Sequence, residues 1–209
     1  MALLSALSLH PWRIAISPRE LQAEAGAGAR QAVDCALLQW LRQRLPNALP
    51  WILPLTDCAE TCLAQARALG VDALLLAGGG DVGAQPRREA AEDLLLAEAE
   101  RMGWPVLGIC RGLQRLQVCA GGVLAGIPGH VACTHALLPG DEQVNSWHRF
   151  GIQQAAPGWI ALAHAPDGSV EAMRHARLPW LGLMWHPERE AGSPALAEPW
   201  LHALFDRAG

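Results

Sequence analysis

Residues 106–114 read Val-Leu-Gly-Ile-Cys-Arg-Gly-Leu-Gln, a pattern typical of a buried strand that turns directly into a helix. Glycines flank Cys110 as they flank the nucleophile in the Gly-x-Ser-x-Gly turn of hydrolases, where a Cβ would collide with neighbouring backbone. At a helix start the thiolate of Cys110 would feel the positive end of the dipole, and the N–H of Arg111 would point to where an oxyanion forms. The stretch therefore predicts a cysteine nucleophile.

A candidate base for this thiol lies near the other end of the chain. Residues 184–188 read Met-Trp-His-Pro-Glu, an apolar strand that ends in a histidine and an acid. His186 is suited to take the thiol proton, and Glu188 to hold the imidazole in its productive tautomer. Glu190 is a nearby alternative for the third position, and a hydrogen-bonded histidine without a catalytic role is the alternative for His186.

The first half of the chain alternates short apolar runs with helical segments. The runs predict strands at residues 13–17, 49–55, 73–76 and 106–109, and the other segments predict helices within 20–44 and at 58–69 and 89–102. The helix at 89–102 carries acidic residues along the face expected to be outermost. Continuous apolar strands in such an alternation indicate an α/β fold with a mostly parallel sheet and helices on both faces.

Beyond Gly121 the pattern changes to short segments separated by Pro-Gly and Asp-Gly turns. These predict small antiparallel strands at the rim of the site. Residues 181–185 then return as a strand that delivers His186, and residues 194–207 predict a closing helix. Ligands of open α/β sheets bind at the carboxyl ends of the strands, so Gly79, Cys110 and His186 are expected to converge there.

Length and composition narrow the class of protein. The 209 residues suit a single domain spanning 1–209. A net charge of −4 without basic runs argues against nucleic-acid binding, and no apolar stretch reaches the ~20 residues that cross a bilayer. The start of the chain lacks the pattern of a secretory signal, and its six cysteines are not spaced as a disulfide framework. We therefore expect a soluble cytoplasmic protein.

One cluster raises the alternative of a metal site. His130, Cys133 and His135 have a spacing compatible with zinc ligands. No second Cys/His pair completes a shell of four ligands, so we expect no metal. The cysteine chemistry described above needs no other cofactor either.

Five blocks of sequence, in order, carry a resemblance to a known family. They are residues 77–82 (Ala-Gly-Gly-Gly-Asp-Val), 108–114, 144–148 (Val-Asn-Ser-Trp-His), 167–172 (Asp-Gly-Ser-Val-Glu-Ala) and 185–188. With them the chain resembles the class I glutamine amidotransferase superfamily and, within it, the free-standing gamma-glutamyl hydrolases of the C26 peptidase group. The resemblance implies a flavodoxin-like class I glutamine amidotransferase architecture with a small antiparallel addition.

The resemblance also implies roles for individual residues. Cys110, His186 and Glu188 would form the catalytic triad, and the N–H groups of Gly79 and Arg111 the oxyanion hole. The residues implied to bind substrate are Gln114, Asn145, Ser146, Trp147, His148 and Arg149. The reaction would be hydrolysis of a gamma-glutamyl bond through a thioester, with release of glutamate.

Two departures from the family's pattern bear on the substrate. Many gamma-glutamyl hydrolases have two histidines and a glutamine where residues 148–150 read His-Arg-Phe, and the family's Pro and Tyr after the Gly-Gly-x-Asp loop are missing. These features resemble the gamma-glutamyl-CDP-amidate hydrolases of capsule phosphoramidate biosynthesis. Arg149 adds a cation that suits an anionic leaving group, whereas a solvated charge is the ordinary state of this and of Arg111, Arg174 and Arg189.

Three other functions are compatible with these residues. A glutaminase subunit that passes ammonia to a separate synthetase would use the same triad, and a hydrolase of gamma-glutamyl-GABA or gamma-glutamyl polyamines would differ only in the leaving group. A catalytically inactive binding module is the third, although an intact Cys, His and Glu argue against it. The oligomeric state is not determined by the sequence, and a homodimer is one option.

Overall fold

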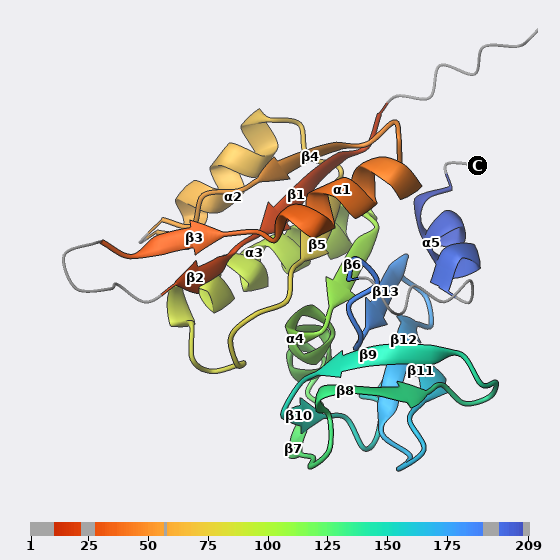
Figure 1. Cartoon of the computed structure of the whole chain (residues 1–209). Helices are drawn as coiled ribbons and strands as arrows, with labels where there is room; N and C mark the ends of the chain where they lie inside the picture. The colour runs from red at the N-terminus through yellow and green to blue at the C-terminus, as the bar shows by residue number, and fades with distance from the viewer. Residues whose placement is uncertain (1–10, 22–27, 57, 190–196, 207–209) are drawn as a thin grey trace, which may run out of the picture.

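A seven-stranded sheet forms the centre of the computed structural model, which describes residues 11–21, 28–56, 58–189 and 197–206 (Figure 1). Its strand order is β11-β12-β13-β6-β5-β1-β4. The strands are β1 (Arg13–Ser17), β4 (Leu49–Ile52), β5 (Ala73–Leu76), β6 (Val106–Ile109), β11 (Trp159–His164), β12 (Val170–His175) and β13 (Trp180–Leu183). Strands β13 to β4 pair in parallel, whereas β11 and β12 are antiparallel, which confirms the predicted mostly parallel sheet.

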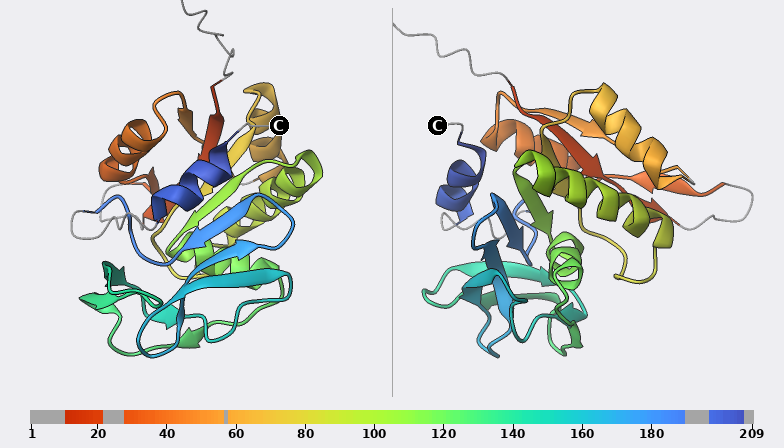
Figure 2. Two further views of the ribbon diagram at one scale, coloured as in Figure 1. Left: turned by 90° about the vertical axis from the view of Figure 1, so that its right-hand side faces the viewer. Right: turned by 180° about the vertical axis from the view of Figure 1, so that it is seen from behind.

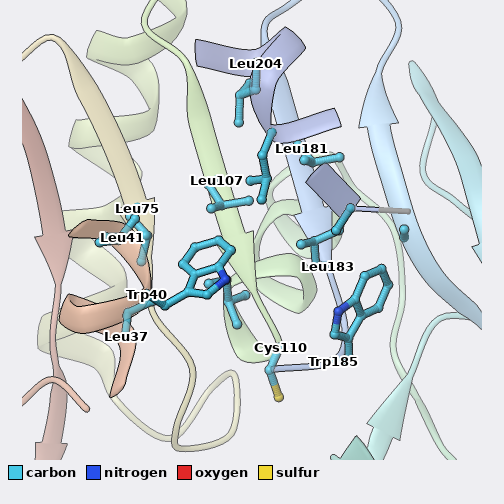
Figure 3. Close-up of a cluster of buried hydrophobic side chains, with 14 of the residues drawn as sticks. Leu37, Trp40, Leu41, Leu75, Leu107, Cys110, Leu181, Leu183, Trp185 and Leu204 are labelled. Atoms are coloured by element: carbon cyan, nitrogen blue, oxygen red, sulfur yellow. The ribbon is translucent and has the colours of Figure 1, made fainter. Parts of the chain in front are cut away.

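Helices cover both faces of the parallel strands, which is why β5 and β6 are buried at every residue. On one face α1 (Cys35–Arg44) and α5 (Ala197–Phe205) pack over the sheet, and Trp40, Leu107 and Leu204 belong to the apolar cluster between them (Figure 3). The other face carries α2 (Ala59–Ala68), α3 (Pro86–Met102) and α4 (Arg111–Cys119) (Figure 2).

The prediction of a helix-rich stretch at 20–44 was wrong in its first half. β2 (Arg19–Leu21) and β3 (Arg30–Ala32) form a two-stranded hairpin, and residues 22–27 lie outside the described part of the chain. Asp34 begins α1, because its carboxylate accepts a hydrogen bond from the N–H of Ala36 at 3.0 Å. The cap fixes the start of this helix well after residue 20.

Two other helix boundaries also differ from the prediction. α3 begins at Pro86 rather than at residue 89, because a proline is tolerated in the first helical turn, where its missing N–H has no partner anyway. α5 ends at Phe205, and residues 194–196 and 207 of the predicted helix are outside the described residues. No helix among the described residues is long and apolar enough to cross a membrane.

The predicted antiparallel addition follows α4. β7 (Ala125–Gly126) pairs with β10 (Phe150–Gly151), and β8 (Val131–Ala136) pairs with β9 (Gln143–Trp147). The β8–β9 hairpin lies beside β11 and β12 (Figures 1 and 2). Backbone hydrogen bonds between Leu138, in the loop between β8 and β9, and His164, the last residue of β11, join the hairpin to the central sheet. The hairpin is thereby held against the antiparallel end of the central sheet.

Candidate active site

Cys110 lies in a sharp turn between β6 and α4, as the sequence predicts. Its φ of 52° and ψ of −105° are unusual for a residue with a side chain. A Cβ at Gly112 would lie 2.1 Å from the carbonyl oxygen of Leu76, and one at Gly108 would lie 2.7 Å from backbone of Gly112. Both glycines are therefore required for α4 to start against the sheet. The thiol points away from the apolar cluster of Figure 3.

His186 and Glu188 follow β13 at the same edge of the sheet. His186 Nδ1 lies 2.6 Å from Glu188 Oε1, and both side chains are almost fully buried. Asn145 accepts a hydrogen bond from the His186 N–H at 3.0 Å and donates one to the His186 carbonyl at 2.8 Å. Glu188 thus orients the imidazole of His186, and the side-chain amide of Asn145 fixes the backbone of the same residue. Glu190, the rival third member, lies outside the described residues.

The side chains of Cys110 and His186 meet around Gly78. A Cβ built on Gly78 would lie 2.7 Å from His186 Cε1, 3.5 Å from His186 Nε2 and 3.6 Å from Cys110 Cβ. The Cε1–Nε2 edge of the imidazole and the Cβ of Cys110 therefore both border Gly78. This placement suits a base that takes the thiol proton.

Burial raises the pKa of the Cys110 thiol to about 12, although the N–H of Arg111 and the charge of Arg189 act in the opposite direction. The helix dipole considered from the sequence is thus outweighed by loss of hydration. At neutral pH the resting side chain is a neutral thiol. Attack on a substrate then requires that the proton leave as the new bond forms, and His186 is placed to accept it.

A buried arginine fixes the Gly-rich loop that follows β5. Arg88 Nη1 donates to the Gly79 carbonyl at 2.9 Å, and Nη2 donates to the Ala77 carbonyl at 2.5 Å. Gly79 has a φ of +92°, a conformation that favours glycine. Its carbonyl is therefore directed toward Arg88, and the backbone of the loop is held in one arrangement.

The acidic face of α3 is not wholly solvent-exposed, which corrects the sequence prediction. Glu92 is fully buried and accepts hydrogen bonds from Arg88 at 2.8 Å and from Arg111 at 2.6 Å. Burial would raise the pKa of Glu92, but the charges of Arg111 and Arg88 lower it below its ordinary value. Burial also lowers the pKa of Arg88 to about 10. Glu98 of the same helix is nearly buried as well.

This ion network joins the two elements that carry the expected oxyanion donors. Arg88 holds the loop of Gly79, Arg111 begins α4, and Glu92 lies between the two guanidinium groups. The Arg111 side chain is 1% exposed, so a solvated charge is the wrong description of it. The four-residue spacing of Arg88 and Glu92 was visible in the sequence, whereas the partnership with Arg111 was not.

The residues implied to bind substrate are partly engaged within the protein. Gln114 donates to the Phe150 carbonyl at 2.8 Å, and Ser146 Oγ donates to the His130 carbonyl at 2.9 Å. Asn145, as described, binds the backbone of His186. Trp147 is half-exposed, and the Arg189 guanidinium lies 5.7 Å from the centre of its ring. Contacts of these residues with substrate stay a prediction.

The other two implied residues differ strongly in exposure. His148 is buried, and its Nδ1 lies 3.0 Å from the Phe150 carbonyl. Arg149 is exposed, and its guanidinium lies 2.7 Å from the carboxylate of Asp81 in the Gly-rich loop. Arg174 is exposed too. A role for Arg149 at the mouth of the site stays a prediction.

A small pocket lies beside the triad, lined in part by Gly78, Gly79, His186, Arg19 and Arg189. Arg19 packs against the loop so closely that a Cβ on Gly79 would lie 2.6 Å from its Cδ. Arg19 was not predicted to border the site, because the segment that follows it was expected to be helical.

Comparisons with known proteins identify relatives of this chain. The family model of Peptidase C26 matches residues 44–131 and 128–188. The gamma-glutamyl-CDP-amidate hydrolase of Campylobacter jejuni is 25% identical over 166 residues, covering 76% of this chain and 82% of that protein. The gamma-glutamyl-gamma-aminobutyrate hydrolase PuuD of Escherichia coli K12 is 30% identical over 198 residues, covering 73% of this chain and 76% of that protein. The solved structure of a glutamine amidotransferase from Thermotoga maritima superposes with a TM-score of 0.61 at 18% identity, covering 86% of this chain and 76% of that chain, and confirms the fold.

Proposed function

Because the chain belongs to the Peptidase C26 family, we propose that it hydrolyses a gamma-glutamyl amide or phosphoramidate bond through a thioester on Cys110. The observation that carries this proposal is the strained turn that places Cys110 beside His186, whose other ring nitrogen lies 2.6 Å from Glu188. Cys110 comes from the middle of the chain and the other two side chains from near its C-terminal end, and all three follow strands at the carboxyl edge of the sheet. This arrangement supports the roles of nucleophile, base and orienting acid that acyl transfer needs.

In the proposed mechanism Cys110 Sγ attacks the gamma-carbonyl carbon while His186 Nε2 takes the thiol proton. The N–H groups of Gly79 and Arg111 stabilise the oxyanion. Collapse of this intermediate breaks the bond to nitrogen, and His186 returns the proton to the leaving nitrogen, which leaves a glutamyl thioester. Water, deprotonated by His186, attacks the thioester and releases glutamate and the free thiol.

For the leaving group we propose an anionic nitrogen compound, with gamma-glutamyl-CDP-amidate as the leading candidate. Arg19 and Arg189 line the pocket at the triad, and Arg149 stands at the rim. The Arg149–Asp81 pair is exposed and contributes little to stability, so a phosphate can take the place of the Asp81 carboxylate. A charge-assisted hydrogen bond of about 1.5–3 kcal/mol corresponds to roughly tenfold or more in rate. The Campylobacter relative bears this activity in its name.

Measurement of kcat/KM on three substrates tests both the proposed gamma-glutamyl hydrolysis and the proposed anionic leaving group. We expect gamma-glutamyl-CDP-amidate to be preferred over a gamma-glutamyl polyamine and over glutamine. Arg149→Ala should lose about tenfold on the nucleotide substrate alone. Arg174→Ala, which removes an exposed arginine of β12, serves as the matched control. Equal rates on the neutral conjugate would refute the anionic leaving group and leave a general gamma-glutamyl hydrolase.

Two further outcomes decide between the classes of function. Fastest turnover of glutamine, with release of ammonia, would favour the glutaminase alternative. Cys110→Ser should abolish turnover while the melting temperature stays unchanged, because the turn tolerates a small residue. If a glutamine-analogue electrophile failed to label Cys110 in the wild type, the protein would be a binding module and the proposed reaction would be wrong.

A further inference from the structure

Three histidines and one glutamate that the mechanism does not use converge under the β8–β9 hairpin. His135 lies on β8, His130 just before it, His148 just after β9, and Glu171 on β12 of the central sheet. One ligand-capable atom of each lies within 4.8 Å of those of the other three. His130 Nδ1, His135 Nε2 and His148 Nε2 lie 3.7, 3.6 and 3.5 Å from Glu171 Oε1.

The carboxylate at the centre of this cluster is buried without hydrogen bonds. Glu171 is 0% exposed, and neither of its oxygens has a hydrogen-bond partner among the described residues. The Nε2 atoms of His135 and His148 are likewise buried and lack such partners. Burial of an uncompensated carboxylate is very unfavourable, and a cation bound at this place would neutralise it.

The outer ring nitrogen of each histidine has a hydrogen-bond acceptor of its own. His130 Nε2 lies 3.0 Å from the Asp167 carboxylate, and His135 Nδ1 lies 3.1 Å from the Ala136 carbonyl. His148 Nδ1 lies 3.0 Å from the Phe150 carbonyl. Each acceptor places the N–H of a neutral imidazole on the outer nitrogen, which leaves a lone pair facing Glu171.

The geometry points to a metal ion between these lone pairs, and we propose that His130, His135, His148 and Glu171 bind one zinc ion. The nitrogen–oxygen distances of 3.5–3.7 Å are too long for hydrogen bonds. In a tetrahedral zinc site with bonds of about 2.0–2.2 Å, two ligand atoms lie about 3.4 Å apart. Histidine ligands whose second nitrogen donates to a carboxylate or a carbonyl are the usual arrangement around zinc.

This proposal departs from the expectation of no metal. The sequence offered His130 and His135 but no second pair, because the remaining ligands come from another strand and from the central sheet. It also assigns His148 to the metal instead of the substrate. Four protein ligands leave no open position, so the zinc has a structural role and fastens the β8–β9 hairpin to β12. Asn145 of β9 binds the backbone of His186, so the same ion steadies the hairpin that holds the base.

Metal analysis and zinc titration of the full chain, made without a polyhistidine tag, test the proposal. We expect one zinc per chain as purified. After removal of metal with a chelator, saturating zinc should raise the melting temperature by about 5–10 °C. Cobalt in place of zinc should give the strong visible absorption of a tetrahedral site. A metal-free protein that shows no thermal response to zinc would overturn the proposal, and the cluster would then be a protonated His–Glu group.

Three variants separate a built site from stray binding. His135→Ala removes the most exposed of the four ligands, at 12% side-chain exposure, and should abolish zinc binding. Asp167→Asn keeps all four ligands and should weaken zinc about 10- to 100-fold, which decides the matter if His135→Ala does not fold. His164→Ala, on the neighbouring strand β11, is the control and should bind zinc like the wild type. Equal zinc affinity in the wild type, His135→Ala and Asp167→Asn would refute the site.

Discussion

Substitution of Gly78 by alanine tests whether the thiol and the imidazole must meet where the structure places them. The added methyl group would lie 2.7 Å from His186 Cε1, whereas carbon atoms in ordinary contact are about 3.5–4.0 Å apart. His186 must therefore retreat by about 1 Å, a displacement that can cost a reaction about 100-fold in rate. The φ of Gly78 lies outside the left-handed range, so alanine adds no backbone strain.

The assay is kcat with a gamma-glutamyl substrate, measured beside the melting temperature. We expect Gly78→Ala to lose about two orders of magnitude in kcat, with the fold retained. Gly126→Ala is the matched control, because nothing lies within 4 Å of its Cβ position. Full activity of Gly78→Ala would show that His186 and Cys110 do not act together across this glycine.

Three other predictions concern buried charge and protonation. Because burial raises the pKa of Cys110 to about 12, its alkylation without substrate, followed by peptide mass spectrometry, should accelerate with pH well beyond pH 9; a plateau near pH 7 would contradict a neutral resting thiol. Glu92→Gln leaves buried arginines uncompensated and should lower the free energy of unfolding in urea by about 3–5 kcal/mol, and an unchanged midpoint would contradict the network. Hydrogen bonds from two arginines lower the pKa of Glu98 from 4.5 to about 2, so its stabilisation is present above pH 4.5 and is lost as the pH falls toward 2. The difference in melting temperature between the wild type and Glu98→Gln should therefore shrink between pH 7 and pH 2.5, and a constant difference would refute it.

The elements that the sequence predicted best are those whose ends are marked by local chemistry. β1, β5 and β6 match the predicted residues, because each is a short apolar run between turn residues or helices. The β2–β3 hairpin was missed because its strands are short and polar. Propensity carries little information about such an edge element.

The site could be predicted only as far as its motifs reach. The turn around Cys110 and the His-Pro-Glu segment at 186–188 are local patterns, and both lie at the same edge of the sheet. Glu92 looked like a surface acid, because a single sequence shows the charge of a side chain and not its partners. Its partner Arg111 lies on α4, far from Glu92 in the sequence. The contact of His130 with Glu171 of β12 could not be predicted for the same reason.

The Asn145 side-chain amide makes two hydrogen bonds with the His186 backbone, in the manner of a hydrogen-bonded residue pair between two β-strands, although β13 has already ended. The backbone of the base is thereby hydrogen-bonded as firmly as a residue within the sheet. Local opening of the β8–β9 hairpin must break the two hydrogen bonds between Asn145 and His186. The amide proton of His186 and the amide protons of β9 should therefore exchange with solvent as one cooperative unit. The β8–β9 hairpin and the base thus share a single local stability, and this hairpin is as necessary to the imidazole as the strand from which it emerges.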